Sequence, residues 1–322
     1  MTIRGSAGPL RAVAVRAWGS APLLLVAASL FWALNPIVGR AVRDLISPVA
    51  LSFWRWAVAL LVVLVFAWPH LRRDALLIRQ HWKILLVLGL IGIGVFSTVV
   101  YWGLQYTTAL NNLMMQSAMP SMILAMSAIL FRDRITWAQI FGTLVSLAGL
   151  LTIVARGDLA NIISMEFNRG DAAALFGVFL YSLYSALLRK RPPIHPLSLL
   201  GVLFAIGVAT LTAPYLAELI RGRHMIAGGE TLMAIVYVGV FPSLLSFFFF
   251  NRSVELIGTA RAGTYMNLPP VFGIGLAILL LGEALEFFHV IGALLVAIGV
   301  FCATKEWGVL PRRGVTEPRR AD

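Results

Sequence analysis

The chain has 322 residues, of which 60% are hydrophobic and only 12% are charged, too few charges for two soluble domains. A mean hydropathy of +0.88 indicates that most of the chain lies in hydrocarbon. The net charge of +12 is high enough to suggest a nucleic-acid partner, but the placement of the basic residues gives another reason for it.

A membrane-spanning helix needs about 20 apolar residues, and ten apolar stretches of about this length follow one another along the chain. Their unbroken character excludes the two-residue alternation of a membrane β-barrel. The sequence therefore predicts an all-α integral membrane protein with ten transmembrane helices. In chain order the stretches are 21–38, 49–68, 84–101, 110–131, 137–154, 172–188, 197–216, 232–250, 262–281 and 287–303.

The Lys and Arg residues fix a predicted orientation for these spans. With a cytoplasmic N-terminus, nineteen of the 26 basic residues fall in the inner segments and six in the outer loops, while Arg55 lies within a span. This asymmetry follows the positive-inside rule. Both termini are therefore expected in the cytoplasm of a bacterial inner membrane, and no nucleic-acid partner is needed to explain the charge.

Two segments of the chain share landmarks 150 positions apart. "SAMPSMILAMSAILFRDRITWAQIFG" starts at Ser117 and "NLPPVFGIGLAILLLGEALEFFHVIG" at Asn267. Each half contains five spans, an odd number, so the second half enters the membrane from the opposite side. Such inverted-topology repeats are typical of secondary transporters, although duplicated helices that merely pack well are the alternative. The paired landmarks are Pro120 with Pro270, Asp133 with Glu283, Gly142 with Gly292 and Gly149 with Gly299.

The repeat divides the chain into five predicted segments. Residues 1–20 form a cytoplasmic N-terminal segment and 305–322 a cytoplasmic tail. The two five-helix repeats occupy 21–155 and 171–304, joined by a periplasmic connection at 156–170.

The opening "LFWALNPIVGRAVRDLISPVALSFWRW" and the closing block with Pro270, Gly282, Glu283, Gly292 and Gly299 resemble the drug/metabolite transporter superfamily, specifically its EamA-type members. The chain departs from that pattern in Trp32-Ala33 and in Arg132–Asp133, where the family commonly has Trp-Gly and Gly-Glu. The resemblance covers nearly the whole chain and implies a ten-helix inner-membrane carrier of small organic solutes. It does not imply a particular solute.

Polar and aromatic residues inside spans are the candidate solute ligands, because burying them in a membrane is costly. Each also has a structural explanation, as helix glue, as an interface anchor or as a partner for a carbonyl freed by proline. Arg55 is expected to serve as a gate, as a structural tie or as the counter-ion of a solute carboxylate. Pro36 is expected to kink the first span, and Pro269 with Pro270 the ninth. The predicted substrate-binding residues are Trp32, Asn35, Tyr101, Asn112, Gln116, Tyr181, Tyr184, Tyr265 and Asn267.

The remaining chemistry favours a carrier over an enzyme. All fourteen acidic residues fall in loops or at helix ends, so no buried carboxylate is expected to relay protons, and cationic solutes lack a partner. The single Cys302 and the lack of catalytic or metal motifs predict neither a cofactor nor a metal. We expect alternating-access export of a neutral or zwitterionic solute such as an amino acid. A membrane-embedded enzyme or a lipid scramblase is the alternative. The expected partners are the solute and membrane lipids, and the chain is expected to be a monomer or a weak homodimer.

Overall fold

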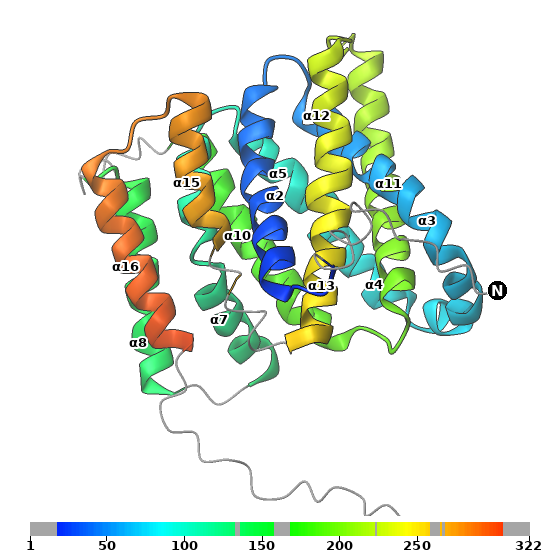
Figure 1. The fold of residues 1–322 in the computed structure, drawn as a ribbon, viewed down its shortest axis with the longest axis horizontal. Coiled ribbons are helices and arrows are strands. Elements are labelled where there is room, and N and C mark those ends of the chain that lie inside the picture. Colours follow the sequence, from blue (N-terminus) through cyan, green and yellow to red (C-terminus); the bar gives the residue numbers. More distant parts are fainter. Residues whose placement is uncertain are drawn as a thin grey trace, which may run out of the picture.

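The computed structural model describes residues 18–132, 136–157, 168–222, 224–257, 265 and 268–304, and within these ranges it contains helices and no strand. Figure 1 shows the helices in chain order. The first half comprises α2 (Ala21–Ala41), α3 (Pro48–Gln80), α4 (Trp82–Gly89), η1 (Leu90–Val95), α5 (Phe96–Gly103), α6 (Ala109–Gln116), α7 (Met119–Phe131) and α8 (Trp137–Val154). The second half comprises α10 (Arg169–Leu187), η2 (Leu188–Lys190), α11 (Pro196–Ile220), α12 (Gly229–Val240), η3 (Phe241–Leu245), α13 (Ser246–Ile257), α15 (Leu268–Leu281) and α16 (Phe287–Thr304).

Each predicted span overlaps one or more helices of the described residues, although the ninth is described only at 265 and from Leu268 onward and the fourth is interrupted between α6 and α7. Six of these are long and apolar enough to cross a membrane by length and composition. The pair α6 and α7 is bent by 45° and counts as a seventh candidate if it forms one span. The apolar helices α8, α15 and α16 are shorter. The described part of the chain therefore carries six or seven candidate spans, against the ten expected.

Caps at the helix starts explain where several spans begin. Ser47 caps α3, because its hydroxyl accepts a hydrogen bond from the backbone N–H of Ala50 at 3.0 Å. Thr108 caps α6 in the same way, and Thr136 forms a capping box with Gln139 at the start of α8. These short polar residues satisfy backbone donors that the apolar spans cannot satisfy themselves.

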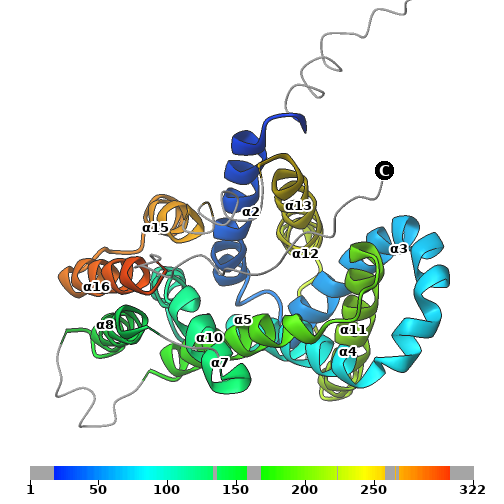
Figure 2. The same cartoon turned by 90° about the horizontal axis from the view of Figure 1, so that it is seen from below.

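The packing of helices repeats when the two halves are exchanged. Helix α2 packs against α13 and α15, and its counterpart α10 packs against α5 and α7; α3 packs against α11, and α8 against α16. Seen from below, α8 and α16 lie at one end and α3, α4 and α11 at the other (Figure 2). The α2–α13 and α10–α5 groups lie between these two ends. These correspondences follow the 150-residue offset of the sequence landmarks.

Small residues bring α8 and α16 into close contact. A Cβ atom on Gly149 would lie 2.7 Å from the carbonyl oxygen of Gly292, and one on Gly299 would lie 2.5 Å from that of Gly142. Because Gly149 meets Gly292 and Gly142 meets Gly299, the two helices run antiparallel. The glycines that the sequence aligned as equivalents thus form a common helix interface.

Two irregularities of the backbone also recur at the same offset. The π-helical turns η1 and η3 begin at Leu90 and Phe241. Left-handed residues end α7 and α15, at Arg132 with a φ of 54° and at Gly282 with a φ of 66°. Turns of π-helix are uncommon and occur frequently at functional sites, so η1 and η3 direct attention to their surroundings.

Candidate functional site

Arg55 on α3 lies at the centre of a buried polar group formed by four elements. Its side chain is only 8% exposed. Its Nε donates to the Ser243 hydroxyl at 2.7 Å, and its Nη1 donates to Asn35 Oδ1 at 3.1 Å and to the Tyr101 hydroxyl at 2.9 Å. Tyr101 in turn donates to Asn35 Oδ1 at 2.8 Å. The group therefore connects α2, α3, α5 and η3.

Local backbone structure positions two members of this group. Ser243 lies in η3, where its hydroxyl donates to the carbonyl of Val238, five residues earlier, at 2.7 Å and leaves its oxygen free to accept from Arg55. Tyr101 lies flat against Gly39, where a Cβ atom would come within 2.7 Å of the Tyr101 ring. A π-helical turn and a glycine are thus both needed for these side chains to meet.

The guanidinium group of Arg55 has only neutral partners among the described residues. No carboxylate bonds to it there, and its Nη2 has no hydrogen-bond partner there. The Trp56 ring lies 4.6 Å from the guanidinium carbon and supplies a cation–π contact. A buried cation with an unused donor can bind a carboxylate by strong, charge-assisted hydrogen bonds.

Tryptophan side chains hold both π-helical turns. Trp32 Nε1 donates to the carbonyl of Pro242 in η3 at 3.0 Å. Trp56 Nε1 donates to the Ser97 hydroxyl at 2.9 Å, and Ser97 donates to the carbonyl of Ile93 in η1 at 2.7 Å. The two indoles tie the irregular turns to α2 and α3, next to Asn35 and Arg55.

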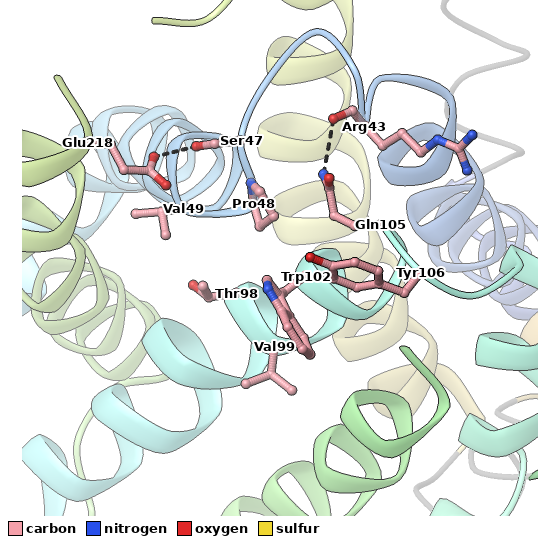
Figure 3. Close-up of a pocket in the computed structure, with 10 residues that line it drawn as sticks. All are labelled: Arg43, Ser47, Pro48, Val49, Thr98, Val99, Trp102, Gln105, Tyr106 and Glu218. Carbon is pink, nitrogen blue, oxygen red and sulfur yellow. Dashed lines mark hydrogen bonds between the residues drawn. The ribbon is translucent and has the colours of Figure 1, made fainter. Parts of the chain in front are cut away.

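A hollow of about 340 Å³ opens near the N-terminal end of α3 and the C-terminal ends of α5 and α11 (Figure 3). Ser47 and Glu218 lie at one edge, hydrogen-bonded to each other, and Arg43 and Gln105 lie at the other. Thr98 on α5 also lines the hollow. Its mixed polar and apolar wall suits a small organic molecule.

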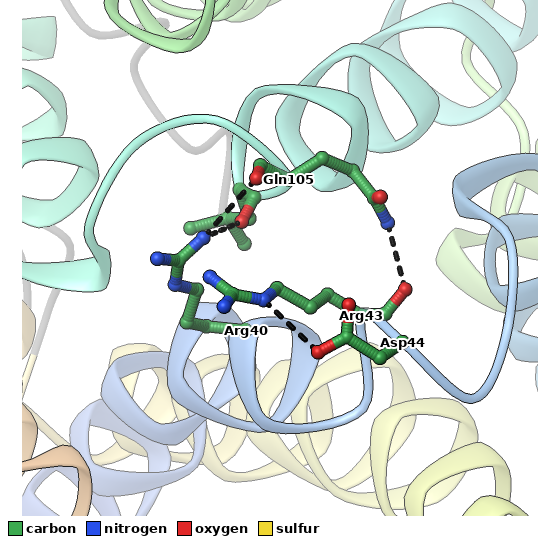
Figure 4. A network of polar contacts seen from close by, with 5 residues as sticks. Arg40, Arg43, Asp44 and Gln105 are labelled. Carbon is green, nitrogen blue, oxygen red and sulfur yellow. Dashed lines mark hydrogen bonds and ion pairs between the residues drawn. The ribbon is translucent and has the colours of Figure 1, made fainter.

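Polar contacts join the C-terminal ends of α2 and α5 near this hollow (Figure 4). Arg40 Nη1 donates to the carbonyl of Leu104 at 2.6 Å, at the C-terminal end of α5. Gln105 Nε2 donates to the carbonyl of Arg43 at 3.0 Å. Arg55 lies seven residues into α3, or about 10 Å along the helix axis. These contacts therefore lie one to two helical turns from the Arg55 group, toward the N-terminal end of α3.

The structure brings only some of the predicted residues together. Asn35, Tyr101 and Arg55 share hydrogen bonds, and Trp32 joins them through η3. Thr98 and Gln105, three residues before and four residues after Tyr101, line the hollow, whereas Tyr101 is 2% exposed and bonds to Arg55.

The other predicted residues lie in separate places. Asn112 is fully buried on α6 and accepts a hydrogen bond from Gln116 Nε2. Tyr184 packs against Gly92, and the Tyr181 ring lies 5.1 Å from that of Phe96. In the described part of the chain, these four residues form no hydrogen bond with the Arg55 group.

The prolines of the predicted first and ninth spans lie in α2 and α15. Pro36 lies within α2, which continues through it. Pro269 and Pro270 follow Leu268, the first described residue of α15, and Met266 and its neighbour Asn267 before it are not described, so the kink expected at these prolines stays a prediction. The Tyr265 carbonyl accepts a hydrogen bond from Ser29 at 3.3 Å. Asn267 lies outside the described residues.

Sequence reasoning missed Ser243, Ser97 and Trp56. A serine in a span usually bonds to its own helix, so neither hydroxyl stood out. The available signal was the Pro242-Ser243 pair inside an apolar run, since proline frees a carbonyl that needs a donor. Among the described residues, no group of three or more His, Cys, Asp or Glu side chains could hold a metal ion.

Comparison with known proteins decides the family. The sequence profile of the EamA-like transporter family matches residues 19–155 and 168–305, which is most of the chain. The chain belongs to the EamA-like transporter family. The two matched segments are its two EamA repeats, and the protein is a multi-pass membrane protein of a transporter family.

Relatives of this EamA-like protein carry transporter names. It is 25% identical over 289 residues to the uncharacterized transporter YyaM of Bacillus subtilis, covering 88% of this chain and 92% of YyaM. It is 23% identical over 233 residues to a probable terminal-alkyne amino-acid exporter of Streptantibioticus cattleyicolor, covering 72% of this chain and 76% of the relative. A solved structure described only as a crystal structure of a protein has the same fold, with a TM-score of 0.59 at 21% identity over 88% of this chain and 97% of the other.

Proposed function

We propose that this EamA-like protein is a secondary transporter that exports small neutral or zwitterionic metabolites, amino acids in particular, across a bacterial inner membrane. In this proposal ten helices cross the membrane as two inverted five-helix halves, which rock about the Arg55 group in alternating access. Both termini are cytoplasmic. The relative named as an amino-acid exporter supports the solute class and the direction.

Three observations support the inverted arrangement. The helix contacts repeat when the halves are exchanged, α8 and α16 run antiparallel, and the π-helical turns recur at the same offset. In this arrangement the shorter helices α8, α15 and α16 also cross the membrane. At 18 residues, α8 is about 27 Å long, close to the roughly 30 Å of hydrocarbon that a span must cover.

The single observation that carries the solute class is the buried charge of Arg55. Its partners among the described residues are neutral, and its Nη2 is unused. An isolated buried cation is costly unless an anion pairs with it. The carboxylate of a zwitterionic amino acid supplies that anion without adding net charge to the solute.

The test is binding of the twenty common L-amino acids to the purified protein, measured by the rise in its melting temperature. Each amino acid that binds is compared with its amide, which lacks the carboxylate. Charge-assisted hydrogen bonds contribute about 1.5–3 kcal/mol, so the amide should bind roughly 10- to 100-fold more weakly. Counterflow of the same amino acid into proteoliposomes then tests transport.

The variant R55M separates the carboxylate contact from general binding. Tyr101 and Asn35 keep their hydrogen bond to each other, and Ser243 keeps its bond to Val238, so few groups lose their only partner. R55M should bind acid and amide equally weakly. The matched control R73Q removes an exposed charge from the same helix and should retain the preference for the acid. Equal binding of acid and amide by the wild type contradicts the carboxylate contact, and absence of amino-acid counterflow contradicts the proposed function.

A further inference from the structure

A second buried polar group joins α6, α10 and α16, separate from Arg55. Its acid is Asp171 in the first turn of α10, which is 0% exposed. Asp171 Oδ1 accepts hydrogen bonds from the Thr107 hydroxyl and from Asn111 Nδ2, the latter at 3.2 Å. Its Oδ2 is buried and has no hydrogen-bond partner among the described residues. The sequence places Asp171 at a helix end and predicts no buried carboxylate, and the structure corrects that expectation.

A series of hydrogen bonds leads from His289 to Asp171, and the partners fix which atom donates at each step. The backbone N–H of Glu286 donates to His289 Nδ1 at 3.0 Å, so Nδ1 bears a lone pair. The proton of the neutral ring is therefore on Nε2, which lies 2.7 Å from Asn111 Oδ1 and donates to it. Asn111 then presents its amide donors to Thr107 and Asp171. The imidazole of His289 and the carboxyl group of Asp171 are thus connected by hydrogen bonds through the side-chain amide of Asn111.

No charged side chain among the described residues bonds to Oδ2 of Asp171. Arg156 after α8 and Glu286 before α16 are the charged side chains that act on this pair, and Arg169 lies on the same helix as Asp171. Glu283 is engaged elsewhere, because its carboxylate accepts from two backbone N–H groups at the start of α6. A carboxylate oxygen without a partner in the interior is costly while it is charged, and binding a proton removes that charge.

We propose that Asp171 is a proton-binding site, and that one proton bound and released at Oδ2 couples the transport cycle to the proton gradient. When the outer end opens, an O–H bond forms at Oδ2 as a hydronium ion loses one of its O–H bonds and becomes water. On release the Oδ2–H bond breaks and a water molecule takes the proton as hydronium, so only water takes part besides Asp171. Asp171 follows the inter-repeat connection that is expected in the periplasm, which places it near the outer entrance. The coupling rests on the proposed transport function, whereas proton binding itself does not.

Infrared titration of the purified full-length protein in lipid bilayers tests proton binding without a solute. The carbonyl stretch of protonated Asp171 should appear reversibly as the pH falls through the range in which the protein stays folded, as one component of the band given by all the protonated acids. This Asp171 component should be missing from D171N, so that it appears in the difference between the wild-type and D171N spectra, while D44N, which changes an exposed acid, should retain it. Asn at position 171 has the shape of the protonated acid and an oxygen that can accept the same two hydrogen bonds, so the fold should persist.

A second variant keeps the test decisive if D171N fails to fold. T107V removes one donor to Oδ1 and should shift the titration midpoint of the same band. A difference between the wild-type and D171N spectra that contains no titrating carboxylic-acid component, or a midpoint of that component unchanged by T107V, would each overturn the proton site. A merely structural acid would stay charged at every pH at which the protein is folded.

Proteoliposomes that contain a pH-sensitive dye and a mixture of the twenty amino acids test the coupling. In the wild type, amino-acid flux should move protons, while D171N should exchange labelled for unlabelled amino acid without moving them. Amino-acid flux without proton movement in the wild type would overturn the coupling and leave the proposed function standing. Absence of any amino-acid flux would overturn the proposed function, and the infrared titration would still decide the proton site.

Discussion

Replacing Tyr101 by Phe removes one hydroxyl from the centre of the Arg55 group and leaves its ring against Gly39. The hydroxyl donates to Asn35 at 2.8 Å and accepts from Arg55 at 2.9 Å. A neutral hydrogen bond contributes about 1 kcal/mol and one to a charged group about 1.5–3 kcal/mol. Arg55 and Asn35 keep their own bond at 3.1 Å, so neither is left without a partner. Because both partners keep this bond, we expect the free energy of unfolding to fall by about 2 kcal/mol, less than the sum of about 2.5–4 kcal/mol.

Equilibrium unfolding in mixed micelles, followed by tryptophan fluorescence, measures this loss. A change of about 2 kcal/mol corresponds to a roughly 30-fold shift in the folding equilibrium. The matched control is Y106F, because Tyr106 is 50% exposed and its hydroxyl forms no hydrogen bond with another described residue. Y106F should unfold like the wild type. If Y101F is no less stable than Y106F, the hydroxyl does not hold the group together and the geometry described here is wrong.

Two further substitutions test how the helices meet. G299L should lower the melting temperature sharply, because even a Cβ atom would lie 2.5 Å from the Gly142 carbonyl oxygen and would force α8 and α16 apart. The control G275L, on an open surface, should change the melting temperature little. Similar losses in both variants would contradict the close interface. E283A leaves two backbone N–H groups at the start of α6 without a carboxylate, so the free energy of unfolding should fall by about 0.5–2 kcal/mol in the same micelle assay. If E283A is as stable as the wild type, water satisfies these two N–H groups in place of the carboxylate and the cap does not stabilise the fold.

Much of the architecture could be predicted from apolar run length alone, because a span must be about 20 residues long. The 150-residue offset of the landmarks aligned Gly142 with Gly292 and Gly149 with Gly299 as equivalents, whereas the contact between Gly149 and Gly292 is seen only in the structure. Asn35 and Tyr101 could be nominated because polar groups in spans are costly. These inferences depend on properties that a single helix carries in its own sequence.

The contacts between helices could not be predicted in the same way. Ser243 reaches Arg55 because η3 is a π-helical turn, which shifts the register of the eighth span, and no residue pattern specifies that shift. Asp171 looked solvated because it begins a helix. It is buried because Gly170 approaches the backbone of Thr107 closely, where a Cβ atom would lie 2.5 Å from the Thr107 nitrogen. How deeply a helix end is buried depends on the elements packed against it, which the local sequence does not show.

Cysteine labelling from one side of the membrane tests the inverted arrangement most directly. Arg132 and Ala284 are exposed residues at the equivalent ends of the two halves, and Asp133, the partner of Glu283 in the sequence alignment, lies outside the described residues. With Cys302, the only cysteine, replaced by Ala, A284C in intact cells should react with a membrane-impermeant maleimide, and R132C should react only after permeabilisation. Labelling of both positions from the same side would contradict the inverted repeat and the transport mechanism built on it.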